Sequence, residues 1–138
     1  MEWMLLPLKR YADFSGRSRR KEYWMFVLGS LILYAVVGGI FFALAATADD
    51  TSSDGLGAGG IVAMLLIAVV ALGLFIPSLA VQVRRFHDQD KSGWFVLLGF
   101  IPYLGGIIVL VFMCLPGTVG PNRFGPDPKA ENLSDVFA

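Results

Sequence analysis

Three long stretches of this chain carry no charged residue, and they limit what it can fold into. Each contains an apolar run of about 20 residues or more, the length that an α-helix needs to cross a hydrocarbon core about 30 Å thick. We therefore predict an all-α polytopic membrane protein, built as a small bundle of three apolar helical segments. The predicted membrane segments are residues 24–48, 61–83 and 94–115.

Composition supports a lipid environment. Of the 138 residues, 56% are apolar and only 16% are charged, whereas about 25% of the residues of a soluble domain are charged. Too few polar side chains remain to cover the surface of a soluble protein of this size. We expect a single integral-membrane domain over residues 1–129 and a disordered tail over residues 130–138.

The positions of the basic residues predict the orientation in the membrane, because Lys and Arg in short loops stay on the cytoplasmic side. Six precede the first segment, none lies in the first loop and three lie in the second. The amino terminus and the second loop are therefore expected in the cytoplasm, and the first loop outside. The two basic residues after the third segment, Arg123 and Lys129, do not decide its side.

The third segment is ambiguous. As one helix at 1.5 Å per residue, residues 94–115 are about 33 Å long and span the core. The sequence PYLGG, which begins at Pro102, interrupts the segment near its middle, so the alternative is a re-entrant hairpin broken at Pro102. A hairpin tip leaves backbone amides and carbonyls in lipid unless protein covers them. Length alone favours the single span.

Two further features concern the interface and helix packing. Trp3, Leu5, Leu6, Leu8 and Tyr11 occur together with Lys9 and Arg10, which predicts a short amphipathic amino-terminal segment in the membrane interface, interrupted by Pro7. The first membrane segment also carries a stripe of small residues spaced by four, along which helix backbones approach closely in lipid. The stripe consists of Ala35, Gly39, Ala43 and Thr47.

The apolar runs hold no ionisable side chain except tyrosine and cysteine, so we expect the chemistry in the polar loops. Three patterns stand out there: FSGRSRRKEYW from Phe14, RRFHDQDKSGW from Arg84 and GPNRFGPDP from Gly120. A basic residue near an anionic leaflet contributes on the order of 1 kcal/mol, and simple anchoring of the topology already explains such a cluster. The alternative is a specific anion or lipid head-group site.

The candidate ligands of that site are Arg17, Arg20, Arg84, Arg85, His87 and Arg123. Other positions in the three patterns are interpreted as structural: Gly16, Glu22, Trp24, Asp88, Ser92, Trp94, Asn122 and Gly125.

The second pattern holds the only histidine, His87, beside Asp88. This neighbourhood resembles an acid/base pair, but one histidine among a few carboxylates is a weak catalytic signal. A single histidine does not satisfy zinc, and the lone Cys114 provides neither a disulfide nor a thiolate cluster. We therefore expect a non-enzymatic protein without a metal or another cofactor.

In this order and at these separations, the three patterns resemble the domain of unknown function 805 family of small bacterial inner-membrane proteins (YhaH/YhaI-like). The resemblance covers residues 1 to about 129, and the long first loop with its Gly and Ser residues departs from it. It implies a location in the bacterial inner (plasma) membrane and carries no established activity. If the three patterns form one site, they must share a membrane face, which the hairpin allows and the single span forbids.

Two functions of different classes follow from these observations. The first is a non-enzymatic binding or assembly protein whose basic cytoplasmic face contacts anionic lipid or a protein partner. The alternative is a subunit of a small oligomeric transporter or channel, with the small-residue stripe as the contact between copies. The expected partners are therefore the bilayer, anionic lipids and, as a homo-oligomer, further copies of the chain, whereas the balanced charge gives no indication of a nucleic acid.

Overall fold

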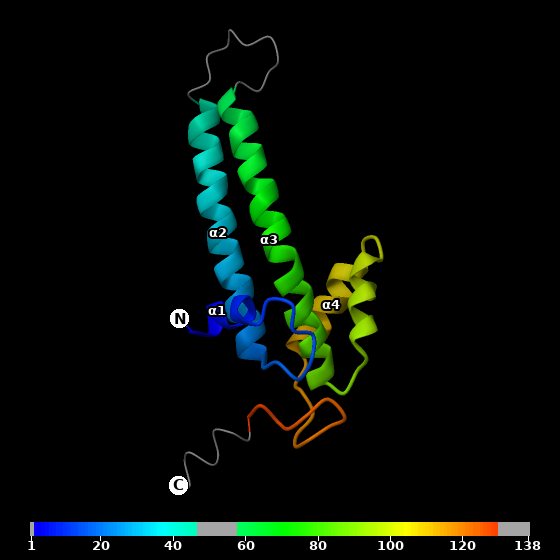
Figure 1. Ribbon diagram of the computed structural model, residues 1–138. Helices are drawn as coiled ribbons and strands as arrows, with labels where there is room; N and C mark the ends of the chain where they lie inside the picture. Colours follow the sequence, from blue (N-terminus) through cyan, green and yellow to red (C-terminus); the bar gives the residue numbers. More distant parts are fainter. Residues whose placement is uncertain (1, 47–57, 130–138) are drawn as a thin grey trace. The chain divides into compact units, whose positions relative to one another are not determined.

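The structure, a computed structural model, describes residues 2–46 and 58–129. The predicted disordered tail and Thr47 of the small-residue stripe lie outside this part. The helices are α1 (Glu2–Lys9), α2 (Arg20–Ala46), α3 (Ala58–Asp88), the 3-10 helix η1 (Gly93–Phe100) and α4 (Gly105–Cys114) (Figure 1). Between its described residues the chain makes no sheet, only an isolated bridge of Asn122 with Gly125. The prediction of an all-α fold is confirmed.

The first two predicted membrane segments are confirmed as long apolar helices. α2 has 27 residues and α3 has 31, so at 1.5 Å per residue they are about 40 and 46 Å long. Both exceed a hydrocarbon core of about 30 Å, and both are apolar enough to cross it. α2 begins at Arg20 rather than at Trp24, and α3 ends at Asp88 rather than at Val83. Helical hydrogen bonding thus continues beyond the apolar run and includes the basic motifs.

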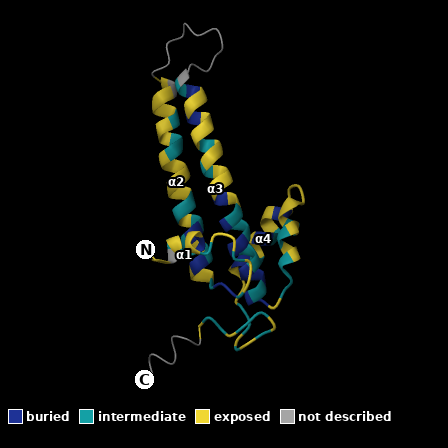
Figure 2. Cartoon of the chain, viewed as in Figure 1, coloured by how far each residue is buried: buried dark blue, intermediate teal, exposed yellow. Residues whose placement is uncertain are grey.

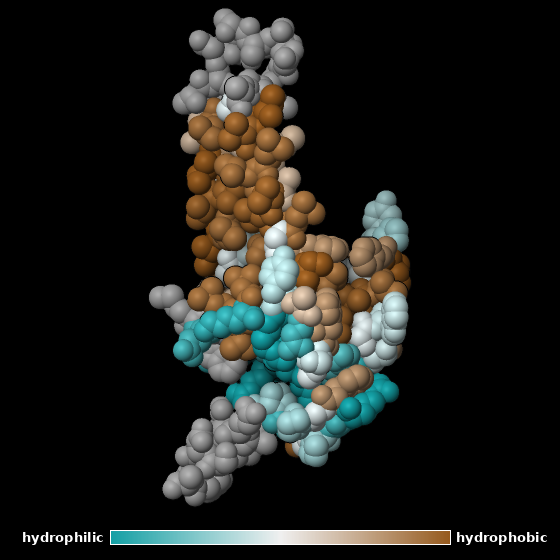
Figure 3. Space-filling model, in the orientation of Figure 1, coloured by the Kyte–Doolittle hydropathy of each residue, from teal (hydrophilic) through white to brown (hydrophobic). Residues whose placement is uncertain are grey.

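The chain forms two compact units, which we describe separately. The motif unit comprises Met1–Phe26 and Ile76–Ala138, and the helix-pair unit comprises Val27–Phe75. In the helix-pair unit the two helices approach closely at Gly59, where a Cβ atom would lie 3.6 Å from the Leu44 carbonyl oxygen. Large apolar side chains cover the surface of this unit (Figures 2 and 3). A continuous apolar surface of this kind requires lipid or another apolar partner.

The amino-terminal segment forms the short helix α1, and its predicted position in the membrane interface stays a prediction. Leu5 and Leu8 are exposed, whereas Pro7 is fully buried in the motif unit. The helix carries Glu2 in its first turn and Lys9 in its last turn, the charge order that favours the helix dipole. α1 therefore packs against the rest of the motif unit through Pro7 and leaves Leu5 and Leu8 exposed.

The prediction of one continuous span over residues 94–115 is wrong, and the broken alternative is the structure observed. η1 and α4 are joined by a turn and pack against each other as two limbs, which we call the short hairpin (Figure 1). η1 has 8 residues and α4 has 10. At about 2.0 and 1.5 Å per residue these limbs are about 16 and 15 Å long, so neither crosses a core of about 30 Å.

Backbone geometry explains the break. Proline disfavours helical geometry at the preceding residue, and Ile101, which precedes Pro102, is extended (φ −69°, ψ 120°). Tyr103 has a φ of +65°, which belongs to left-handed backbone and interrupts a right-handed helix. Gly105 then lets the limbs close, because a Cβ atom there would lie 2.4 Å from the Leu98 carbonyl oxygen. These local constraints outweigh the length of the apolar run.

An apolar core holds the short hairpin against the end of α3. Its buried members are Phe86, Val109 and Met113, and its partly buried members are Tyr23, Val96, Leu98 and Phe112. The Phe86 ring centroid lies 5.9 Å from that of Phe95 and 5.7 Å from that of Phe112, within the range of favourable aromatic pairs. Each limb therefore contributes an aromatic ring to Phe86, which fixes the hairpin beside the polar end of α3.

Candidate functional site

All three sequence patterns meet in the motif unit. The loop after α1 reaches the end of α3 through Ser18, whose amide donates to the Arg84 carbonyl oxygen at 3.2 Å. The segment after α4 reaches the same end through Thr118, whose amide donates to the Asp88 carbonyl oxygen at 2.8 Å. Because α4 returns the chain toward α3, the third pattern lies beside the other two.

Asp88 is the anionic centre of this meeting point. Its Oδ1 lies 2.9 Å from Nη2 of Arg17, and its Oδ2 accepts a hydrogen bond from Nη1 of Arg85. None of the three side chains is more than 5% exposed. A buried charge is stable only when it is paired and hydrogen-bonded, so these three groups depend on one another, with one carboxylate serving two guanidinium groups.

Arg17 also organises the chain after α4. Its Nη1 donates to the Gly120 carbonyl oxygen and its Nη2 to the Thr118 carbonyl oxygen, each at 2.6 Å. A guanidinium group presents five donors in a rigid planar fork. Here the fork holds a segment that has no regular secondary structure of its own.

Asn122 and Asp127 complete the attachment of this segment. The Asn122 side-chain amide donates to the His87 carbonyl oxygen at 2.9 Å. Asp127 accepts hydrogen bonds from the backbone amides of Lys129 and Gly120, and these bonds hold the pKa of Asp127 below its usual value. Hydrogen bonds of side chains therefore hold this loop in place, although it forms no helix or sheet of its own.

His87 and Asp88 do not form an acid/base pair. Nδ1 of His87 lies 3.2 Å from the Gly16 carbonyl oxygen. Its ring stacks on Phe124, with centroids 3.9 Å apart and planes inclined by 6°. The Asp88 carboxylate binds its two arginines instead. His87 thus fastens the first and third patterns to α3, while the expectation that the chain is not an enzyme stays a prediction.

A second buried ion pair joins α2 to α3. Nη2 of Arg84 lies 3.5 Å from Oε1 of Glu22, and the two side chains are 0% and 4% exposed. Among the described residues, neither Oε1 of Glu22 nor the two terminal nitrogens of Arg84 have a hydrogen-bond partner. The attraction between these groups is therefore that of two charges at close range, without the added energy of a well-formed hydrogen bond.

The other two predicted arginine ligands are exposed. Arg20 donates to the Cys114 carbonyl oxygen at 2.9 Å, which ties the start of α2 to the end of α4. Arg123 pairs with Asp90 at 3.2 Å on the surface. Surface pairs of this kind contribute little to stability, typically about 0–1 kcal/mol.

Several residues interpreted as structural occupy specialised positions. Ser92 caps η1 by accepting a hydrogen bond from the Trp94 amide at 3.4 Å. Gly16 and Gly125 have φ angles of +78° and +137°, in the region that favours glycine. Trp24 and Trp94 are exposed, as expected for aromatic residues at a membrane interface.

Burial divides the six predicted anion ligands. Arg17, Arg84 and Arg85 are buried and already have carboxylate partners in the chain, His87 is half-buried, and Arg20 and Arg123 are exposed. Anion binding by the set stays a prediction. Sequence reasoning missed the role of Glu22 and Asp88 as buried counter-ions. The available signal was that each acid lies within a few residues of an arginine cluster.

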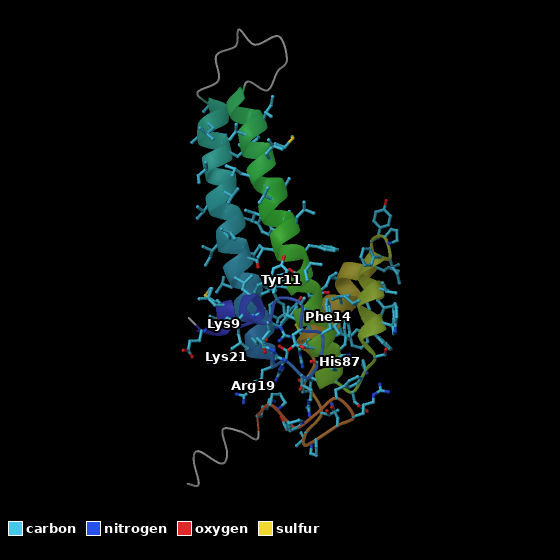
Figure 4. The ribbon with its side chains drawn as sticks, viewed as in Figure 1. Lys9, Tyr11, Phe14, Arg19, Lys21 and His87 are labelled. Carbon is cyan, nitrogen blue, oxygen red and sulfur yellow. The ribbon has the colours of Figure 1, made fainter. Side chains whose placement is uncertain are left out.

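Exposed cations gather near the start of α2. Lys9, Arg20 and Lys21 are exposed, and we call these three residues the basic surface. Figure 4 shows Lys9, Arg19 and Lys21 on one side of the motif unit and His87 with Phe14 on the other. Lys9 and Lys21 are absent from the predicted ligand set. The sequence does not report burial, and burial is what separates these surface cations from the buried arginines.

The chain matches the family described as "Protein of unknown function (DUF805)" over residues 11–126. It is 45% identical to inner membrane protein YhaH of Escherichia coli (strain K12) over 131 residues, which cover 95% of this chain and 99% of that protein. It is 43% identical to inner membrane protein YhaI of the same strain over 129 residues, covering 94% and 97%. No solved structure matches the chain significantly.

Proposed function

Because the chain belongs to the DUF805 family, whose members in Escherichia coli include inner membrane proteins, we propose that it is a non-enzymatic protein that binds anionic lipid head groups at the cytoplasmic face of that membrane. The observation that carries the proposal is that some cations of the motif unit are buried and others are exposed. The buried arginines are paired with carboxylates, whereas the basic surface is exposed.

The proposed topology has two spans and one re-entrant hairpin. α2 and α3 are long enough to cross the membrane, and each limb of the short hairpin reaches only about half of a 30 Å core. The excess of Lys and Arg at the motif unit supports a cytoplasmic position for that unit. The hairpin then enters and leaves on the cytoplasmic side, so both described ends of the chain share that side.

Charge and apolar surface meet where lipid head groups would lie. Lys9 ends α1, and Leu5 and Leu8 of the same helix are exposed. Arg20 and Lys21 begin α2 just before the exposed Trp24. A basic residue beside an anionic leaflet contributes on the order of 1 kcal/mol. Three such residues next to interfacial apolar side chains therefore favour anionic over zwitterionic lipid at this surface.

The test is to replace Lys9 and Lys21 together with glutamine. Losing two cations is expected to weaken binding of anionic lipid by about 2 kcal/mol, or roughly thirtyfold. The measurement is the ratio of anionic to zwitterionic lipid retained by the purified protein, determined by native mass spectrometry.

Lys129→Gln is the matched control, because Lys129 is exposed on the segment that follows α4. It is expected to retain the same lipids as the unaltered chain. An unchanged lipid ratio in the Lys9→Gln/Lys21→Gln protein would contradict the proposed role of the basic surface.

The second candidate function is a subunit of a small oligomeric channel or transporter. Gly38 and Gly39 of α2 favour it, because a Cβ atom at either position would meet nothing within 4 Å among the described residues. An open small-residue face lets another helix approach closely in lipid. A stable oligomer in mild detergent that Gly39→Ile dissociates would support this function, and a strictly monomeric chain would oppose it.

A further inference from the structure

A cavity in the motif unit is lined by residues other than the three of the basic surface and has a different charge pattern. Its volume is about 330 Å³, within the range of about 300–1,000 Å³ typical of small-molecule sites. Segments from both ends of the chain enclose it. Its polar lining consists of Arg10, Arg17, Arg19 and Glu22, and its remaining lining consists of Leu6, Gly16, Phe124, Gly125, Pro126 and Pro128.

Three guanidinium groups provide its cationic wall. The N–H groups of Arg17 are already bound to Asp88 and to backbone carbonyl oxygens. Arg17 therefore contributes positive charge to the cavity but no hydrogen-bond donor for a ligand. Arg10 binds Asp13 through Nε and Nη2, and its side chain is partly exposed. Hydrogen bonds from Ser15 and Arg10 hold the pKa of Asp13 well below its usual value, so this ion pair keeps Arg10 at the cavity at neutral pH.

Glu22 provides the one acidic group in that lining. Its side chain is 4% exposed and its contact with Arg84 is 3.5 Å long, while its Oε1 accepts no hydrogen bond from a described residue. A buried carboxylate oxygen without a hydrogen bond, such as Oε1 of Glu22, is costly. A ligand that donates charge-assisted hydrogen bonds to Glu22 would lower that cost, and an ammonium group is the strongest such donor.

We propose that this cavity binds a phosphoryl group linked to a primary ammonium group, with Arg10 and Arg19 facing the phosphate and Glu22 facing the ammonium. Aminophospholipids carry this head group, and it also occurs in soluble form as phosphoethanolamine. The apolar wall accommodates the short carbon linker, and Leu6 neighbours the exposed Leu5 of α1. The site extends the proposed function from anionic lipid on a surface to a zwitterionic head group in a cavity.

The experiment titrates the purified full chain carrying Lys9→Gln and Lys21→Gln in detergent by calorimetry with three probes, so that these two surface lysines do not add a preference for anionic lipid. They are dihexanoyl phosphatidylethanolamine, dihexanoyl phosphatidylglycerol and O-phosphoethanolamine. We expect the ethanolamine lipid to bind at least tenfold more tightly than the glycerol lipid, because only the former brings an ammonium group to Glu22. Binding of free O-phosphoethanolamine as tight as that of its lipid would identify a soluble ligand, and tighter binding of the lipid would identify the membrane as the source. Both outcomes support the site.

Two variants locate the binding. Glu22→Gln is expected to abolish the preference for ethanolamine over glycerol, because the amide removes the negative charge. Arg10→Gln changes a partly exposed pair and is expected to weaken both lipids about tenfold, with thermal unfolding measured to confirm that the fold persists. Lys91→Gln is the control, since Lys91 is a partly exposed cation that is absent from the cavity lining.

Equal affinity for the two lipids in the chain carrying Lys9→Gln and Lys21→Gln, or no effect of adding Arg10→Gln in a folded protein, would overturn the assignment. The Lys9→Gln/Lys21→Gln result is independent of it, because neither lysine lines the cavity. Failure of the surface proposal and failure of the cavity proposal are therefore distinguishable.

Discussion

Asp88→Asn is expected to lower the free energy of unfolding by about 3–5 kcal/mol, the usual cost of breaking a buried ion pair by removing one partner. The substitution leaves the guanidinium groups of Arg17 and Arg85 without their carboxylate, although both side chains are almost fully buried. Arg17 also holds the segment after α4, so that segment is expected to detach. The measurement is denaturant unfolding of the purified protein in detergent.

Asp90→Asn is the matched control, because Asp90 lies two residues away and pairs with Arg123 at the surface. Its expected cost is at most about 1 kcal/mol. Equal effects of the two substitutions would contradict the conclusion that Asp88 organises the motif unit, because exposure is the main difference between the two ion pairs.

Gly105→Ala is the second substitution expected to have a large effect. The added Cβ atom would lie 2.4 Å from the Leu98 carbonyl oxygen and 2.8 Å from that of Gly99. Both are backbone atoms, so the limbs of the short hairpin must separate, and overpacking of this kind costs about 1–3 kcal/mol. Hydrogen exchange of the α4 amides, followed by mass spectrometry, is expected to accelerate as the hairpin opens.

The neighbouring Gly106 provides the control within the same turn of α4. A Cβ atom at Gly106 would meet nothing within 4 Å among the described residues, and alanine is favoured over glycine in a helix by up to about 1 kcal/mol. Gly106→Ala is therefore expected to leave exchange unchanged or slower. If both substitutions accelerate exchange alike, the close approach of the two limbs is not what holds the hairpin.

The two long helices were predictable because their signal is local. An uncharged run bounded by charges sets the position of a membrane helix to within a few residues, although α2 and α3 continue into the polar motifs at Arg20 and Asp88. The third segment was not decided by the same reasoning. Its apolar length suits a membrane span. The backbone geometry at Pro102, Tyr103 and Gly105 breaks the helix, and the length of the apolar run gives no information about that geometry.

The sequence predicted which loops form the candidate site, but it did not predict which of their residues are buried and which pair with one another. The patterns around Arg17 and Asp88 were recognised, yet their ion pair joins residues far apart in the chain. Pairing of this kind depends on how the fold brings the loop before α2 to the end of α3, so the sequence does not separate a buried arginine from an exposed one. Glu22 illustrates the consequence: an acid expected at the start of a helix is also a nearly buried wall of a cavity.

The central claim is that all three patterns share the cytoplasmic face, because the short hairpin returns the chain to the side it entered from. The most direct test fuses a cytoplasm-active and a periplasm-active reporter in parallel after Ala138. The proposed topology predicts activity of the cytoplasmic reporter alone. Activity of the periplasmic reporter alone would mean that residues 94–115 cross the membrane, which would separate Arg123 from Arg17 and contradict a single site.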